Sequence, residues 1–387
     1  MNVKEKSLDF FDRIERLSGF RPIICLLISL ACRKLVFRGI FKKTINSATS
    51  FDVIISNNHM EYFDQIHEII NLVSQTYKVG LLFEGNERKF DILLKEKFPQ
   101  SILLPINHRL LPGLSTRIYL SSIAGKENYF PKCPKKVFYF HGLAGISGFK
   151  TNGMNAYSDI FCATLYQQKQ IASLYPKKRS VIVGYPKLSK VETLATRKIP
   201  ESNIRVLYAP TLRRMLPFDT KDIFLKDLNI LRSICQAEKV EKVFYKPHPQ
   251  EVRDKGETFF INLINDTRTK EKKLILDLET SQSRIFNCSD ILVTDYSGTA
   301  ITFALKEGKP TFFVAENVDY LAKLNPLAIL LSNIVNSYEQ LSKAFLSASF
   351  FIKNFQENRD SALVIHKEAK EKFVREIQDI LDSEFSL

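Results

Sequence analysis

The stretch "DILVTDYSGTAITFALKEGKPTFFV", residues 290–314, carries the clearest structural pattern in the sequence. Ile291 to Thr294 form a short apolar run rich in β-branched residues, a polar turn follows, and apolar residues then recur at helical spacing as far as Gly308. A second apolar run begins at Thr311. This order predicts a strand, a turn, a helix with a glycine stop, and another strand. Two apolar strands joined by a short helix indicate a right-handed βαβ unit in a parallel sheet.

The turn between this strand and this helix is a candidate phosphate site. Ligands of parallel sheets bind beyond the carboxyl ends of the strands, and the first N–H groups of a helix, together with its dipole, favour an anion. Ser297, Gly298 and Thr299 are small enough to admit a phosphate, and two of them carry hydroxyls. Because the same residues are common in ordinary turns and helix caps, the turn alone leaves both interpretations open.

The sequence on both sides repeats the α/β pattern in two series. In the first, the strand-like runs are "DVIISNN" (52–58), "YKVGLLFEG" (77–85), "SILLPIN" (101–107) and "KKVFYFHG" (135–142), followed by 159–176 and 180–190. Helical spacing occurs at 62–74 and 89–97. In the second, the runs are "RVLYAPTLRR" (205–214), "KVFYKPHPQ" (242–250), "KLILDL" (273–278), "DILVTDYSG" (290–298) and "TFFVAEN" (311–317).

These series predict two α/β domains, at 1–190 and 204–340, joined by the polar stretch 190–204. Residues 341–387 are charged and periodic and are predicted to form terminal helices. Their apolar anchors, counted from about residue 336, are Phe345, Phe351, Phe355, Val364, Phe373, Ile377 and Ile380. Two domains of similar size would face each other across a cleft, where a nucleotide-linked substrate would bind.

Composition and charge limit the class of protein. A hydrophobic share of 45% with 25% charged residues is typical of a globular chain. The net charge of +14 points to a polyanionic partner, which includes nucleic acid, an anionic membrane and phosphorylated substrates. The cysteines contain no C-x-x-C pair, which favours a reducing cytoplasm over a disulfide framework. They are Cys25, Cys32, Cys133, Cys162, Cys235 and Cys288.

The segment 21–43, "RPIICLLISLACRKLVFRGIFKK", combines a short apolar run with basic residues and has no carboxylate. Its apolar run, 23–32, is too short to span a bilayer and lacks the basic cap of a signal peptide. The composition suits a helix lying on an anionic membrane surface, and it also suits a buried helix with a solvated basic edge.

Two histidines follow predicted strands. His141 comes directly after "FYF" and precedes Gly142, and a histidine in this position can act as a general base near neutral pH. It can equally be a hydrogen-bonded structural residue. His248 lies between two prolines, which hold the backbone on both sides, and Lys246 lies close by in the sequence.

The run "RVLYAPTLRR" adds weaker candidates. Tyr208 to Thr211 leave a predicted strand, and Arg213 follows, whose guanidinium can grip phosphate oxygens with two parallel bonds. No P-loop, Rossmann dinucleotide, α/β-hydrolase or zincin motif occurs, and no Asp-x-Asp indicates a metal-held diphosphate. We therefore predict no cofactor and no metal ligands.

Taken in order, these motifs resemble the CDP-glycerol glycerophosphotransferase family, which contains teichoic-acid primases and polymerases and their capsule relatives. The matching pieces are "FHG" (140–142), "VGYPKLSK" (183–190), "VLYAPTLRR" (206–214), "YKPHP" (245–249) and "CSDILVTDYSGTAITFALKEGKP" (288–310). The resemblance implies a GT-B fold with an acceptor-side first domain. It also implies peripheral association with the cytoplasmic face of the membrane, and a CDP-linked donor bound mainly by the second domain.

The resemblance also implies residue roles. His141 matches the base that deprotonates the acceptor hydroxyl, and His248 matches the histidine that stabilises the diphosphate and the leaving CMP. The turn at 295–299 matches the one that cradles phosphate. The predicted substrate-binding residues are Gly142, Tyr208, Thr211, Arg213, Lys246, Asp295, Ser297, Gly298 and Thr299.

The sequence departs from the family pattern at two places. Leu143-Ala144-Gly145 follows His-Gly where the family has Thr-Pro and a Lys, and Gly298 replaces a second Ser. The alternatives are a GT-B glycosyltransferase using CMP-Kdo or a UDP-sugar, an enzyme similar to UDP-GlcNAc 2-epimerases, and an inactive membrane scaffold. A nucleic-acid-binding protein is disfavoured because the basic residues are not arranged in a recognisable reader motif.

Overall fold

The computed structural model describes most of the chain beyond residue 49, and every structural statement below refers to the residues it describes. These are 50–57, 60–83, 89–104, 115–123, 133–145, 154–189, 191, 197–213, 216, 223–268, 273–279, 282–346 and 350–383. The basic segment 21–43, with its predicted membrane contact, lies outside the described residues. Among the described helices, none is long and apolar enough to cross a membrane.

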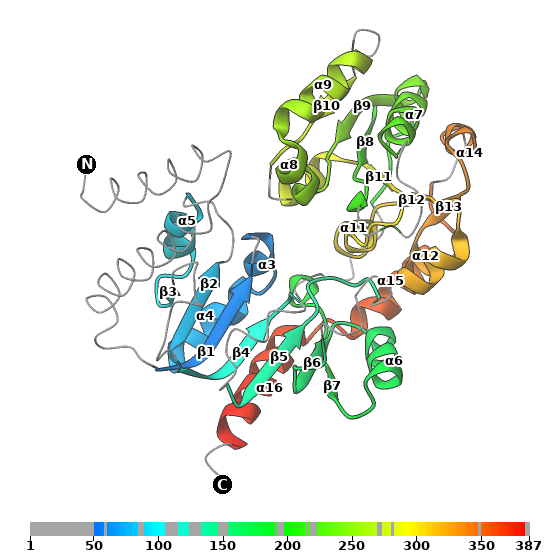
Figure 1. The fold of residues 1–387 in the computed structure, drawn as a ribbon. Coiled ribbons are helices and arrows are strands. Elements are labelled where there is room, and N and C mark those ends of the chain that lie inside the picture. Colours follow the sequence, from blue (N-terminus) through cyan, green and yellow to red (C-terminus); the bar gives the residue numbers. More distant parts are fainter. Residues whose placement is uncertain are drawn as a thin grey trace, which may run out of the picture.

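The first half of the described chain forms a parallel sheet of seven strands in the order β3-β2-β1-β4-β5-β6-β7 (Figure 1). Its strands are β1 (Ser50–Asn57), β2 (Val79–Phe83), β3 (Ile102–Leu104), β4 (Ser115–Ser121), β5 (Lys135–Tyr139), β6 (Asp159–Cys162) and β7 (Arg179–Ile182). Its helices are α3 (Met60–Gln65), α4 (His67–Thr76), α5 (Lys89–Lys97), α6 (Leu165–Leu174) and the short η4 (Pro186–Leu188). This strand order is that of a doubly wound Rossmann-like sheet.

The second sheet has six parallel strands in the order β10-β9-β8-β11-β12-β13. They are β8 (Ile204–Tyr208), β9 (Val240–Tyr245), β10 (Leu274–Leu276), β11 (Ile291–Thr294), β12 (Thr311–Val314) and β13 (Asn333–Val335). The helices from here to the end are α7 (Ile223–Gln236), α8 (Pro249–Lys255), α9 (Glu257–Arg268), α10 (Ser283–Cys288), α11 (Thr299–Glu307), α12 (Val318–Leu324), α13 (Pro326–Leu331), α14 (Tyr338–Ala344), α15 (Phe355–Val364) and α16 (Ala369–Ser383). Two Rossmann-like sheets in one chain confirm the predicted GT-B class.

The βαβ unit predicted at 290–314 is present as β11, α11 and β12. β11 and β12 pair in parallel, and Gly308 ends α11 with φ +62°, in the left-handed region that favours glycine. A Cβ at Gly308 would lie 3.4 Å from the guanidinium carbon of the buried Arg359. Arg359 Nε also donates to Leu305 O at 3.0 Å, so a cation stabilises the carbonyl end of α11.

Two strands were not predicted from the sequence. β4, "STRIYLS", pairs with both β1 and β5 although its first three residues are polar. Its last four residues are buried, whereas Ser115 at its start is exposed and Arg117 is half-buried. β13 has only three residues, too few to show a period. Val364 was predicted to be an apolar anchor but is 62% exposed, because the buried face of α15 carries Phe355, Arg359 and Leu363 instead.

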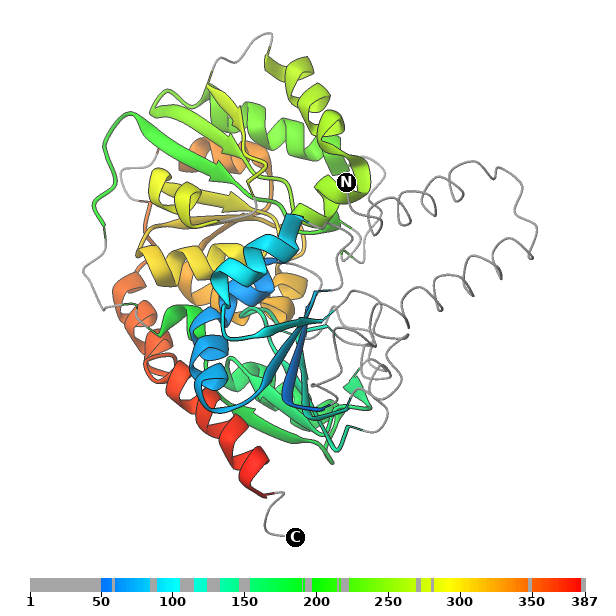
Figure 2. The same cartoon turned by 90° about the vertical axis from the view of Figure 1, so that its left-hand side faces the viewer.

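An apolar core joins the two sheets. One continuous cluster of buried side chains includes Phe138 and Leu143 from the first half and Phe303 and Leu305 of α11 from the second. The C-terminal helices also connect the halves: Phe373 of α16 stacks edge-on against Phe161 of the first sheet. Figure 2 shows these helices, in orange and red, running along one side of the molecule from the second sheet to the first.

A buried histidine connects the C-terminal helices to the loop after β7 of the first sheet. His366 lies between α15 and α16, and its Nδ1 accepts a hydrogen bond from Tyr185 N–H at 3.0 Å. Gly184 has φ +79°, and a Cβ there would lie 2.7 Å from Ile365 O, so only glycine permits this approach. Burial lowers the pKa of His366 to about 4, so its ring is neutral in the folded protein near neutral pH.

We expect His366 to make stability depend on pH. Its pKa falls from 6.5 in the unfolded chain to about 4 when folded, so between these values the unfolded chain binds more protons. The contribution, on the order of 3 kcal/mol, is therefore complete above pH 6.5 and is lost as the pH falls towards 4. His366→Asn keeps an acceptor for Tyr185 N–H but cannot titrate. Urea unfolding between pH 4 and 7 should show a shallower pH dependence in this variant, and an unchanged slope would contradict a neutral buried ring.

Candidate active site

A cavity of about 340 Å³ lies between the two sheets and is lined by residues from both. Of the predicted site residues, it brings together His141, Gly142, Thr211, His248, Ser297, Gly298 and Thr299. Tyr208, Arg213, Lys246 and Asp295 are not among its lining residues. A cavity of this size is within the usual range for small-molecule sites.

The topology explains why these residues meet. In each sheet the strand order reverses direction once, between β1 and β4 in the first and between β8 and β11 in the second. The loops diverge at such a point and leave a crevice at the carboxyl ends of the strands. His141 follows β5, next to the first reversal, and the turn 295–299 follows β11 at the second. The cavity is thus bordered by both crevices.

His141 is held as a neutral ring with a defined tautomer. Its Nδ1 lies 3.3 Å from the backbone oxygen of Ser122, which can only accept, so Nδ1 carries the proton. The ring of Tyr62 stacks over it, with centroids 4.2 Å apart. Burial lowers the pKa of His141 to about 4, and the bond to Ser122 only partly opposes this shift. Nε2 is therefore the nitrogen that can accept a proton.

His248 has the opposite tautomer. It is the N-cap of α8, and its Nδ1 accepts a hydrogen bond from Gln250 N–H at 3.2 Å. In the neutral ring the proton then lies on Nε2, which becomes a hydrogen-bond donor. Pro249 at the first helical position favours this cap geometry because its φ is already helical. The two cavity histidines therefore offer one proton acceptor, Nε2 of His141, and one hydrogen-bond donor, Nε2–H of His248.

The turn before α11 has the features of an anion site. Ser297, Gly298 and Thr299 line the cavity, and Thr299 N–H donates to Ser297 Oγ at 3.3 Å. The first turn of α11 contains no acidic residue that would oppose an anion. Gly298 faces the loop of the first sheet: a Cβ on it would lie 3.5 Å from the Cβ of Ala144.

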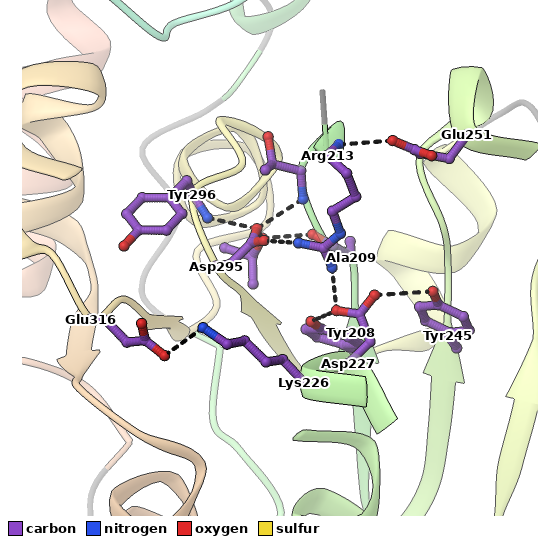
Figure 3. A network of polar contacts seen from close by, with 12 residues as sticks. Tyr208, Ala209, Arg213, Lys226, Asp227, Tyr245, Glu251, Asp295, Tyr296 and Glu316 are labelled. Carbon is purple, nitrogen blue, oxygen red and sulfur yellow. Dashed lines mark hydrogen bonds and ion pairs between the residues drawn. The ribbon is translucent and has the colours of Figure 1, made fainter. Parts of the chain in front are cut away.

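Arg213 and Asp295 lie beneath this turn, where they bond to each other (Figure 3). The guanidinium of Arg213 also donates to Asp227, and both carboxylates are buried. Burial alone would lower the pKa of Arg213, but Asp295 and Asp227 raise it above its ordinary value. Asp295 accepts further hydrogen bonds from Thr211 N–H at 2.8 Å and from Tyr296 N–H at 2.6 Å. The bonds of Asp295 to Thr211 and Arg213 therefore connect the loop after β11 to the loop after β8.

Tyr208 and Lys246 are likewise engaged inside the second domain. Tyr208 is fully buried and its hydroxyl donates to Asp227. The Nζ of Lys246 forms an ion pair with the buried carboxylate of Asp277 at 3.3 Å. The polar groups of Tyr208, Lys246, Arg213 and Asp295 thus have partners within the protein. Their direct contact with a substrate stays a prediction.

Several cavity residues were missed from the sequence. The lining also includes Tyr62, Gln65, Tyr185, Tyr296 and Tyr320. Behind it, Gln167 of α6 is fully buried and donates to Gly142 O at 2.9 Å and to Ala144 O at 2.7 Å, which fixes the loop after His141. A capping box, Thr164 with Gln167, was the available signal, since it places this glutamine in the first helical turn.

The described lining carries little charge. It contains no Lys, Arg, Asp or Glu. In the described part of the chain, no group of three His, Cys, Asp or Glu residues is placed to hold a metal ion. Within this lining, a bound phosphate would meet backbone N–H groups, hydroxyls and the two histidines.

Comparison with known proteins supports this architecture. Residues 157–347 match the model of the family "CDP-Glycerol:Poly(glycerophosphate) glycerophosphotransferase". No curated protein sequence matches the chain significantly. The matched range contains His248 and the turn before α11, but begins after His141.

Solved structures share the fold at low sequence identity. A variant of the wall teichoic acid polymerase TagF has a TM-score of 0.56 and 14% identity, covering 87% of this chain and 90% of that chain. A second TagF variant has a TM-score of 0.56 and 15% identity, covering 92% and 95%. The glycosyltransferase of kitacinnamycin has a TM-score of 0.54 and 11% identity, covering 86% and 99%. The fold is GT-B, and residues 157–347, slightly less than half of the chain, match the model of the CDP-glycerol:poly(glycerophosphate) glycerophosphotransferase family.

Proposed function

We propose that this protein transfers a polyol-phosphate from a CDP-linked donor, CDP-glycerol or a similar molecule, to a hydroxyl acceptor in teichoic acid or capsule synthesis. The observation that carries the proposal is the pair of cavity histidines with opposite tautomers, one accepting and one donating. The family match supplies the donor class, since its described activity uses CDP-glycerol.

The chemistry is a direct displacement at phosphorus. The acceptor hydroxyl gives its proton to Nε2 of His141 as its oxygen bonds to the phosphorus nearest the polyol. The bond from that phosphorus to the bridging oxygen breaks, and CMP leaves with the electron pair. His248 donates its Nε2 proton as a hydrogen bond to the phosphate oxygens, on which charge accumulates.

The second domain holds the diphosphate without a cationic side chain from the described lining. Ser297, Gly298 and Thr299 line the cavity, and in this proposal their hydroxyls and the N–H groups of the turn bind the phosphate oxygens. Arg213 and Asp295 act one layer below, where they position the turn. Preorganised dipoles of this kind stabilise developing charge with little rearrangement.

The domain division at 1–190, 204–340 and 341–387 forms part of the proposal, with the acceptor on the first domain and the donor on the second. We also propose that the protein acts at the cytoplasmic face of the membrane and contacts anionic lipid through residues 21–43. The support is the composition of that segment, which has basic and apolar residues and no carboxylate.

His141→Ala should lower turnover about 10²- to 10⁴-fold while donor binding stays nearly unchanged, because the base acts on the acceptor. The assay is release of CMP from CDP-glycerol by purified protein with a lipid or oligosaccharide acceptor extract. His67→Ala, which removes a histidine outside the described cavity lining, is the matched control. An unchanged rate in His141→Ala would remove this residue from the mechanism. Absence of CMP release with CDP-glycerol, but transfer from CMP-Kdo or a UDP-sugar, would establish the glycosyltransferase alternative.

His248→Asn tests the donor role separately. Asn Oδ1 can still accept from Gln250 N–H and cap α8, but the Asn Nδ2, on a shorter side chain, does not reach the position of Nε2. We expect turnover to fall about 10²-fold or more with little change in thermal stability. Single-turnover kinetics and a melting curve provide the measurement. Loss of stability with normal turnover would instead make His248 only a helix cap.

Arg213→Met should lower the free energy of unfolding. It leaves Asp227 and Asp295 buried without their cation, which costs about 3–5 kcal/mol. The matched control is Arg205→Met, because Arg205 is 41% exposed and its pair with Asp290 contributes about 1 kcal/mol or less. Denaturant unfolding compares the two. Equal effects would show that the Arg213 network does not hold the second domain together.

A further inference from the structure

A chain of buried polar side chains lies under His141, at the carboxyl ends of β1, β4 and β5. Asn57 ends β1, Tyr139 ends β5, and Ser122 follows β4. Asn57 Nδ2 donates to the hydroxyl of Tyr139 at 2.8 Å, and Ser122 Oγ donates to Asn57 Oδ1 at 2.5 Å. None of the three side chains has more than 1% of its surface exposed.

Burying three polar groups is costly unless each has a partner, and here the bonds extend to the backbone on both sides. On one side is Ser122, whose carbonyl accepts the Nδ1 proton of His141. On the other side, the hydroxyl of Tyr139 donates to the backbone oxygen of Tyr62 at 3.4 Å. Asn57 is the shared member, since its amide contacts both branches.

The two ends of this chain are also the two contacts that orient the imidazole. The Ser122 carbonyl sets which nitrogen carries the proton, and the Tyr62 ring lies on the imidazole face with a tilt of 30°. Loss of the Asn57 amide would remove the hydrogen bonds that hold Ser122 after β4 and Tyr139, which in turn contacts α3 at Tyr62 O. An apolar side chain at position 57 would fill space but could not bond to either hydroxyl.

We propose that Asn57 is the positioning residue of the catalytic base: through Ser122 and Tyr139 it holds His141 with its proton on Nδ1 and Nε2 facing the acceptor. This inference rests on the proposed role of His141 as the base. Asn57 makes no substrate contact in this proposal, so a substitution of Asn57 can change turnover only through His141.

The first test reads the tautomer directly. In protein carrying isotope-labelled histidine, nitrogen shifts distinguish the two tautomers, and His141→Ala identifies the His141 signals among the six histidines. We expect a single Nδ1–H tautomer in the unaltered protein and a mixture in Asn57→Ala. Thr116→Val, which removes a buried hydroxyl at the opposite end of β4, is the control and should leave the tautomer unchanged. An unchanged tautomer in Asn57→Ala would overturn the proposal.

The second test is a double-mutant cycle on CMP release. Asn57→Ala should lower turnover roughly tenfold or more when His141 is present, and should have no further effect in the His141→Ala background. Equal effects in both backgrounds would show a general structural role and overturn the proposal. If Asn57→Ala fails to fold, Tyr139→Phe removes only one hydroxyl of the same chain and is expected to weaken turnover in the same His141-dependent way.

The two tests separate this inference from the proposed function. A protein that shows the Nδ1–H tautomer, loses it in Asn57→Ala, and releases no CMP from any CDP-linked donor would retain the positioning network while losing the proposed reaction. A protein that releases CMP at an unchanged rate in Asn57→Ala would retain the reaction and lose the network's role.

Discussion

The apolar contact between the two sheets is the interaction on which the site depends. Leu143, directly after the His141–Gly142 pair, and Ile301, in the first turns of α11, belong to the same buried cluster. Burial of apolar surface is non-directional, so it brings the halves together but does not by itself fix their register. Two hydrogen bonds between the halves fix their relative position. Gly145 N–H donates to Leu324 O at 2.5 Å, and the Tyr166 hydroxyl donates to Lys323 O at 2.6 Å. The cavity lies beside this contact, which is why residues of both sheets line it.

Both sheets have a buried polar side chain near the point where the strand order reverses. Two neighbouring loops diverge there, and a polar side chain holds their strand ends in place. In the first sheet Asn57 links the ends of β1 and β5 with the residue after β4. In the second sheet Asp295 links the loops after β8 and β11, with Arg213 as its cation. The neutral amide of Asn57 lies under the neutral imidazole of His141. The ion pair of Arg213 and Asp295 lies under the turn that is proposed to bind phosphate.

The charge of the chain and the charge of the cavity differ. The protein carries +14 overall, yet the described lining contains no lysine or arginine. Helix α11 directs the positive end of its dipole towards the turn at 295–299 without using a charged side chain. Arg359 stabilises the opposite end of the same helix through Leu305 O. The carbonyl end of α11 is thus held by a buried cation, and its amide end lies at the turn that lines the cavity.

The α/β class, the βαβ unit at 290–314 and the position of two histidines after strands could be predicted from the sequence alone, because these depend on local periodicity, glycine placement and short motifs. The sequence did not reveal β4, whose polar first half matches no strand pattern, although this strand lies at the first reversal point. It also gave no sign of the partners of Arg213 and Lys246, which in the fold are Asp295, Asp227 and Asp277. Only the tertiary structure could assign those partners, together with the tautomers of His141 and His248. Hydrogen-bond partners distant in sequence are chosen by packing, and a side chain's chemistry is defined only when its neighbours are known.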